Sequence, residues 1–158
     1  MSGTSRSGGG AAAAGWSRLS GPPHPPPSAT LLRAGGVAAV GAVVANLAIW
    51  GLGKLLGVDF EVTQPDGAQV IVSAGAVVSQ TIVAVLAGTL LLWPMTRLPA
   101  GLLVWTLLAA AFGLGSLIIP LSRANEVSTG LTLALMHLVA LAGALGLPGL
   151  TAYRAGGT

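Results

Sequence analysis

The sequence has few charged side chains and no cysteine. Lys, Arg, Asp and Glu together make up 7% of its 158 residues, whereas ordinary soluble domains contain about 25%. So few charges cannot cover the surface of a soluble protein of this length. The lack of cysteine excludes disulfide bonds, thiol catalysis and cysteine-ligated metal sites within this chain.

The charges that remain are mostly basic, and the formal net charge is +3. A basic chain is a candidate for binding nucleic acid. However, the seven Lys and Arg residues are scattered along the sequence and form no patch. We therefore predict no nucleic-acid partner.

Hydrophobic residues make up 53% of the chain and gather in four long runs. About 20 apolar residues, rising 1.5 Å each, cross the hydrocarbon of a bilayer. The last run, from Thr129 to Leu150, contains a single ionisable side chain, that of His137. The sequence thus predicts an all-α, four-helix transmembrane bundle. The predicted spans are residues 34–56, 70–93, 100–119 and 129–150.

The first 30 residues differ from the rest in composition. Gly, Ser and Ala fill their first half, and five prolines lie between positions 22 and 27. Such a segment has too few large apolar side chains to offset the entropy cost of ordering. We predict that residues 1–30 form a disordered tail and that residues 31–155 form the membrane domain.

Residues 57–69 are the longest polar segment between the predicted spans and contain three of the four carboxylates. Pro65, Asp66 and Gly67 form a turn signal, because Pro fixes φ and Gly tolerates positive φ. Polar and apolar residues alternate before that turn. These features predict a short hairpin on the membrane surface, with an irregular loop as the alternative.

Basic residues near the span ends favour one orientation. Cytoplasmic ends of membrane spans carry an excess of Lys and Arg. With the N-terminus inside, the cytoplasmic side carries Arg6, Arg18, Arg33, Arg97 and Arg154. Lys54 and Arg123 then lie outside. The sequence therefore predicts a multi-pass protein of the cell (plasma) membrane with both termini in the cytoplasm.

Three polar side chains lie near the middle of predicted spans: Asn46, Gln80 and His137. In one interpretation they form hydrogen bonds between helices, each contributing about 0.6 to 2 kcal/mol. In the other they line a polar pocket, because an ionisable residue within a membrane marks a candidate functional site. A small, partly polar face is also predicted on the second span, formed by Ser73, Ala76, Gln80, Ala84 and Ala87.

No complete catalytic set is present. A metal site needs several His, Cys or carboxylate ligands, and no predicted span contains an Asp or Glu to act with His137. We expect no cofactor, no metal and no enzymatic activity. The predicted function is packing, assembly or an accessory role in the bilayer, with itself or another membrane protein as partner. The alternative is a binder or carrier of a small or lipid-like molecule that uses the polar cluster.

The C-terminal run carries a resemblance to a known family. Its residues are Leu135, Met136, His137, Leu138, Val139 and Ala140, followed by Leu147, Pro148, Gly149 and Leu150. This pattern resembles the small four-helix integral membrane proteins of actinobacteria known as domain of unknown function 6069. The resemblance covers residues 31–155 and implies a four-span membrane fold. It implies no activity.

Overall fold

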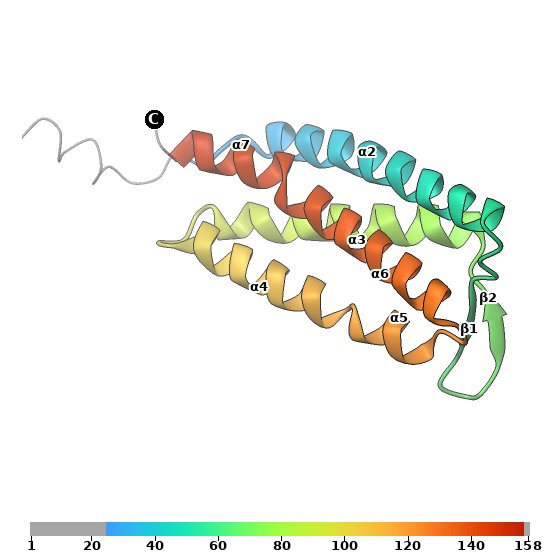
Figure 1. The fold of residues 1–158 in the computed structure, drawn as a ribbon. Coiled ribbons are helices and arrows are strands. Elements are labelled where there is room, and N and C mark those ends of the chain that lie inside the picture. The colour runs from blue at the N-terminus through green and yellow to red at the C-terminus, as the bar shows by residue number, and fades with distance from the viewer. Residues whose placement is uncertain (1–24, 157–158) are drawn as a thin grey trace, which may run out of the picture.

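The computed structural model describes residues 25–156 and forms a bundle of helices with a small hairpin at one end (Figure 1). The elements are α2 (Ser28–Leu55), β1 (Glu61–Thr63), β2 (Gln69–Ile71), α3 (Ala74–Met95), α4 (Gly101–Gly115), α5 (Ile118–Arg123), α6 (Val127–Leu145) and α7 (Leu147–Gly156). Four helical stretches are long and apolar enough to cross a membrane: Ser28–Leu55, Ala74–Met95, Gly101–Arg123 and Val127–Ala155. The predicted all-α bundle of four apolar helices is confirmed.

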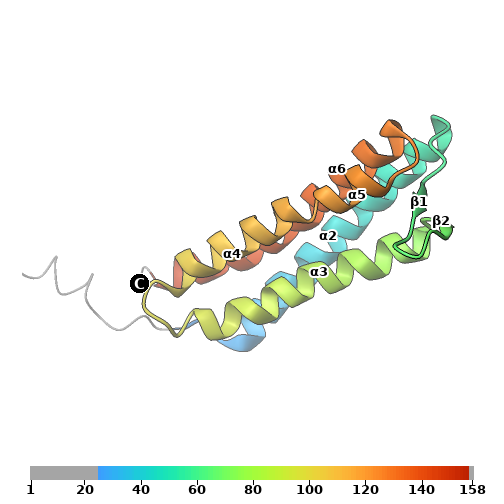
Figure 2. The ribbon, with the colours of Figure 1, turned by 90° about the horizontal axis from the view of Figure 1, so that it is seen from below.

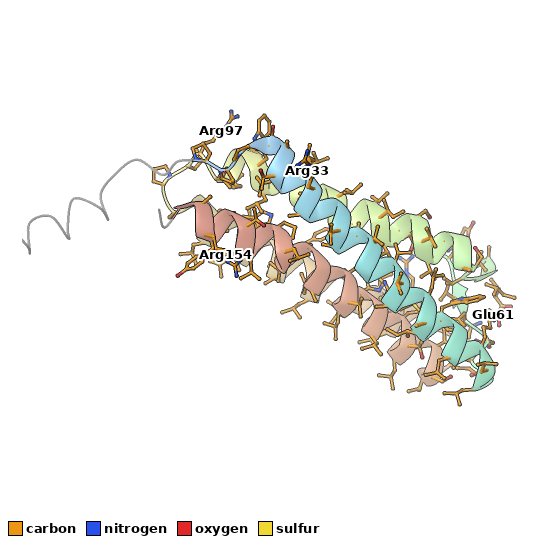
Figure 3. The ribbon with its side chains drawn as sticks, turned by 90° about the horizontal axis from the view of Figure 1, so that it is seen from above. Arg33, Glu61, Arg97 and Arg154 are labelled. Carbon is orange, nitrogen blue, oxygen red and sulfur yellow. The ribbon has the colours of Figure 1, made fainter. Side chains whose placement is uncertain are left out.

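The spans run alongside one another, and α2 makes its largest contacts with α3 and α6. The start of α2, the α3–α4 loop and the end of α7 lie at one end of the bundle (Figure 1). Arg33, Arg97 and Arg154 lie at this end, and Glu61 lies at the other (Figure 3). Three arginines thus lie at one end of the bundle, and Glu61 lies at the other, where Lys54 also contacts Asp59.

The α4–α5 span is the least buried of the four. In its most apolar stretch 6% of the residues are buried, against 28% in each of the other three spans. From the loop that joins them, α3 and the α4–α5 span separate towards the hairpin end (Figure 2). The hairpin half of α3 therefore has no α4 neighbour on that side.

The first two spans begin at different positions from those predicted. Helix α2 starts at Ser28, before the expected residue 34, because Pro27 fixes φ just ahead of the first turn. Residues 28–30 of the predicted tail are thus helical, and residues 1–24 lie outside the described part. Helix α3 starts at Ala74, later than expected, because residues 69–71 form β2.

Each of the last two spans contains a break. The helix of the third span is interrupted after Gly115 and continues as α5 to Arg123. It includes Pro120, which was expected to lie beyond the helix end. Pro120 is in the first turn of α5, where a missing backbone N–H breaks no helical hydrogen bond. The fourth span breaks at Gly146 and resumes as α7, with Pro148 in its first turn.

The segment after α2 is a two-stranded antiparallel hairpin in which Thr63 pairs with Gln69. It is also attached to the loop between α5 and α6. The Asn125 backbone N–H donates to the Glu61 carbonyl at 3.3 Å, and the Thr63 hydroxyl donates to Asn125 Oδ1 at 2.8 Å. The hairpin therefore links the first and third connections at this end of the bundle.

Phe60 closes the hairpin end of the core. Its backbone adopts a left-handed conformation with φ of 62°, and its side chain is fully buried. It packs in one apolar cluster with Val77, Leu133 and Met136, and its ring lies 6.0 Å from that of Trp50. The same α3 and α6 residues line the site described next.

Candidate ligand-binding pocket between the helices

The structure brings the three predicted polar residues to one pocket, with Asn46 on α2, Gln80 on α3 and His137 on α6. The pocket is partly open and has a volume of about 80 Å³. Its remaining lining residues are Val72, Val77, Thr81, Ala84, Leu133, Met136 and Ala140. The site is therefore a small polar pocket with mostly apolar walls.

Asn46 is 1% exposed and forms the deepest polar contact of the pocket. Its Nδ2 donates to Thr81 Oγ1 at 2.9 Å and to the Met136 carbonyl at 3.2 Å. Because a carbonyl only accepts hydrogen bonds, this second contact fixes the orientation of the amide. Asn46 Oδ1 is left buried without a hydrogen-bond partner within residues 25–156.

Thr81 accepts one of the two hydrogens of Asn46 Nδ2. The Thr81 hydroxyl donates to the Val77 carbonyl at 2.7 Å, so its oxygen is free to accept from Asn46. Both amide hydrogens of Asn46 are thus used between α2, α3 and α6. The Asn46 side chain therefore links three helices and also carries an unpaired acceptor.

His137 is half-buried, and its Nδ1 lies 2.8 Å from the Leu133 carbonyl one turn earlier. The carbonyl cannot donate, so Nδ1 carries the hydrogen of this bond. In the uncharged ring the other nitrogen, Nε2, then carries a lone pair and accepts hydrogen bonds. His137 therefore presents a second acceptor at the pocket.

Gln80 lies at the open side of the pocket. Its side chain is exposed and forms no hydrogen bond with another residue in the described part of the chain. It lies six residues after Ala74, about 9 Å along the helix at 1.5 Å per residue. This places an unpaired amide inside the apolar span.

Trp105 of α4 contacts α3 at a position closer to the α3–α4 loop than the pocket is. Its indole Nε1–H donates to the Gly88 carbonyl on α3 at 3.0 Å, and its side chain is buried. Gly88 lies one helical turn beyond Ala84, which is exposed at the pocket. This hydrogen bond thus joins α3 and α4 one turn from the pocket.

The predicted small face of α3 is displaced from the face that packs. The buried residues of α3 are Val77, Thr81, Val85, Thr89 and Leu92, and none of them belongs to the predicted small, partly polar face. Gln80 and Ala84 of the predicted set instead line the pocket. Sequence reasoning missed Thr81, although the four-residue spacing of Val77, Thr81, Val85 and Thr89 is a helical signal.

A second polar cluster lies outside the spans. Asp59 Oδ1 accepts from the Glu61 backbone N–H at 3.0 Å and from the Thr129 hydroxyl at 2.8 Å. These two hydrogen bonds, in that order, hold the pKa of Asp59 below its ordinary value of 3.8. The Lys54 ammonium donates to the Asp59 carbonyl at 2.8 Å. This cluster anchors the start of α6 beside the end of α2.

Metal ligands do not gather at either cluster. Within residues 25–156 no three His, Asp or Glu side chains are placed to hold one metal ion. The pocket contains a single imidazole and two amides, with no carboxylate among its lining residues. The side chains of the pocket that can form hydrogen bonds are thus two amides, one hydroxyl and one imidazole.

The fold defines the class of this chain: it is a four-helix membrane protein. The chain belongs to the family of unknown function DUF6069, whose model matches residues 26–155. The family resemblance seen in the C-terminal run is thereby confirmed. No curated protein and no solved structure matches the chain. Family membership assigns no activity, so function has to be argued from the pocket.

Proposed function

We propose that this protein is a non-enzymatic membrane protein that holds a small molecule in the pocket of Asn46, Gln80 and His137. The unpaired Oδ1 of Asn46 carries the proposal, because this atom is buried and has no donor within the described chain. Leaving a buried acceptor unpaired costs about 1 to 3 kcal/mol. A bound molecule that donates a hydrogen bond to this atom removes that cost.

The test is purification in a mild detergent followed by non-denaturing mass spectrometry. We expect the wild-type protein to carry one additional small molecule per chain. Gln80→Leu should lower the occupied fraction at least tenfold, because it removes a pocket amide without breaking a contact between helices. Detection of the bare chain mass alone, from membranes extracted gently, would contradict the proposal.

Val83→Leu is the matched control for this variant. Val83 is 66% exposed on the same helix and does not line the pocket. Both variants place Leu on the outer surface of α3, so general effects on insertion or extraction are shared. Equal loss of the bound molecule in both variants would show that the pocket is not responsible.

A second candidate function is assembly with a membrane partner, either a second copy or another membrane protein. It is favoured by the low burial of the α4–α5 span. In its most apolar stretch 6% of the residues are buried, against 28% in each of the other spans. Helices associate in bilayers through close packing rather than a hydrophobic driving force. Crosslinking through a Cys at Phe112, which is 83% exposed on α4, tests this. A crosslink yield no higher than that from Leu55→Cys would refute it.

We also propose that both termini are cytoplasmic and that the bundle lies in the cell membrane. The grouping of Arg33, Arg97 and Arg154 at one end supports this orientation under the positive-inside rule. The chain has no cysteine, so single cysteines can be labelled without background. An impermeant reagent should label Asp66→Cys in intact cells and not Ser17→Cys. The reverse result would invert the orientation.

A further inference from the structure

The fixed polar atoms of the pocket select a hydrogen-bond donor. Asn46 Oδ1 accepts and has no partner within residues 25–156, and its orientation is fixed by the Met136 carbonyl. His137 Nε2 accepts in the uncharged ring, because Nδ1 carries the hydrogen bonded to Leu133. Two fixed acceptors repel an anionic group and stabilise an O–H or N–H donor.

The lining also selects against an ion. No Lys, Arg, Asp or Glu lies among the ten lining residues, so a charged group has no counter-charge there. Moving an ion out of water without a counter-charge is far more costly than moving a neutral polar group. The ligand group in the pocket is therefore neutral.

The pocket holds only part of a molecule. Its volume is about 80 Å³, whereas sites that enclose a whole drug-sized ligand have roughly 300 to 1,000 Å³. A cavity needs about 10 to 15 Å³ on this measure to hold one water, so the pocket accommodates a head group of a few heavy atoms. The remainder of a larger ligand has to lie outside.

The outside of the pocket is the apolar surface of the spans. Gln80 and Ala84 are both exposed and lie within α3. Helix α3 and the α4–α5 span separate towards the hairpin end (Figure 2), and no residue of α4 or α5 lines the pocket. At the hairpin end the cluster around Phe60 closes the core, so we take the side of the exposed residues Gln80 and Ala84 as the open one.

From these four observations, and resting on the proposed binding function, we infer the ligand class. It is a neutral amphiphile whose donor head group enters sideways between α3 and α4 and hydrogen-bonds to Asn46 Oδ1, with His137 Nε2 beside it as the second acceptor. Its apolar tail stays in the hydrocarbon beside α3. Gln80, which lines the open side of the pocket, accepts from or donates to the bound head group.

The test uses four probes added to delipidated protein in phosphatidylcholine vesicles, whose lipid carries no hydrogen-bond donor. Hexadecan-1-ol supplies the donor and the tail. 1-Fluorohexadecane has nearly the same size but no donor, hexadecanoate is charged, and ethanol has no tail. Binding is followed by the ¹⁵N shift of His137 Nε2, with His24, the other histidine of the chain, as the reference.

We expect hexadecan-1-ol to shift the Nε2 signal and to bind about tenfold more tightly than 1-fluorohexadecane, because one hydrogen bond is worth about that factor. Equal binding of the fluoro compound would overturn recognition through a donor. Tighter binding of hexadecanoate would overturn neutrality, and equally tight binding of ethanol would overturn sideways entry.

The mouth is tested by a pair of variants on α3. Ala84→Leu fills the open side and should weaken hexadecan-1-ol binding at least tenfold. Ala87→Leu makes the same change at an exposed residue outside the pocket and should leave binding unchanged. Equal effects of the two variants at unchanged melting temperatures would refute entry beside Ala84.

Failure of this inference is distinguishable from failure of the proposed function. If no probe binds but gently extracted protein carries a small molecule, the ligand class is wrong and the binding function stands. If no probe binds and the extracted protein has the bare chain mass, both are wrong. A pocket that holds only water would give this second outcome, with no probe bound and the bare chain mass.

Discussion

Replacing Gly35 by Ala tests the closest approach of α2 to α3. A Cβ at Gly35 would lie 2.5 Å from Thr89 Oγ1 and 2.6 Å from Thr89 Cγ2. Thr89 is 1% exposed, and its hydroxyl donates to the Val85 carbonyl at 2.8 Å. Because Thr is β-branched and stiff at χ1, its side chain cannot rotate away without losing that hydrogen bond.

The magnitude follows from a comparison with the neighbouring glycine. A Cβ at Gly36 would meet no atom within 4 Å, so Gly36→Ala gains only helix propensity, about 0.8 to 1.0 kcal/mol. Gly35→Ala gains the same amount but also incurs an overpacking cost of about 1 to 3 kcal/mol. The severe overlap at Gly35 favours the upper end. We expect the two variants to differ by about 2 to 3 kcal/mol in free energy of unfolding.

The assay is reversible unfolding in lipid–detergent micelles with a rising fraction of dodecyl sulfate. Gly36→Ala should unfold at a higher fraction than wild type, and Gly35→Ala at a lower one. The double variant Gly35→Ala, Thr89→Ala removes the two closest atoms and should recover part of the loss, because the Cβ at position 89, 2.9 Å away, remains. Equal stabilities of the two single variants, or no recovery in the double variant, would refute the packing of α2 on α3 described above.

Three further variants test other contacts. Gly113→Ala should cost less than Gly35→Ala, about 1 kcal/mol, because its Cβ would meet the flexible end of Leu141; Gly115→Ala, with open space, is its control in the same unfolding assay. The lowered pKa of Asp59 stabilises the folded state above the ordinary value of 3.8, and this stability is lost as pH falls through the lowered pKa. Asp59→Asn should abolish that part of the loss, as measured by amide exchange of the hairpin across this pH range. Trp105→Phe should cost about 1 kcal/mol of unfolding free energy through the lost indole hydrogen bond, and an unchanged midpoint would contradict that contact.

The apolar runs were sufficient to predict the four spans, because length and the near-absence of charge decide which segments cross a bilayer. The depth of Asn46, Gln80 and His137 within their runs was sufficient to place them at one level. Helices of similar length that start at opposite ends bring their middles together, and the structure has all three at one pocket.

Other features depend on contacts distant in sequence, which periodicity does not report. The start of α3 was shifted because residues 69–71 pair with residues 61–63, and a pairing partner is invisible in a local pattern. The packing face of α3 is set by how close α2 approaches, so Thr81 rather than Gln80 meets Asn46. Asn46 Oδ1 has no partner within residues 25–156, and a local sequence pattern does not predict this.

The central claim is that Asn46 Oδ1 receives its hydrogen bond from a molecule outside the chain. The sequence contains two asparagines, Asn46 and Asn125, so selective ¹³C labelling gives two side-chain carbonyl signals, and Asn125 serves as the reference. The measurement is solid-state NMR transfer to these carbons from protons of a non-protein molecule, using perdeuterated protein extracted with its native lipids. We predict transfer to the Asn46 carbonyl from an O–H or N–H proton attached to a lipid-soluble molecule. Transfer from water protons alone, or from none, would contradict the account.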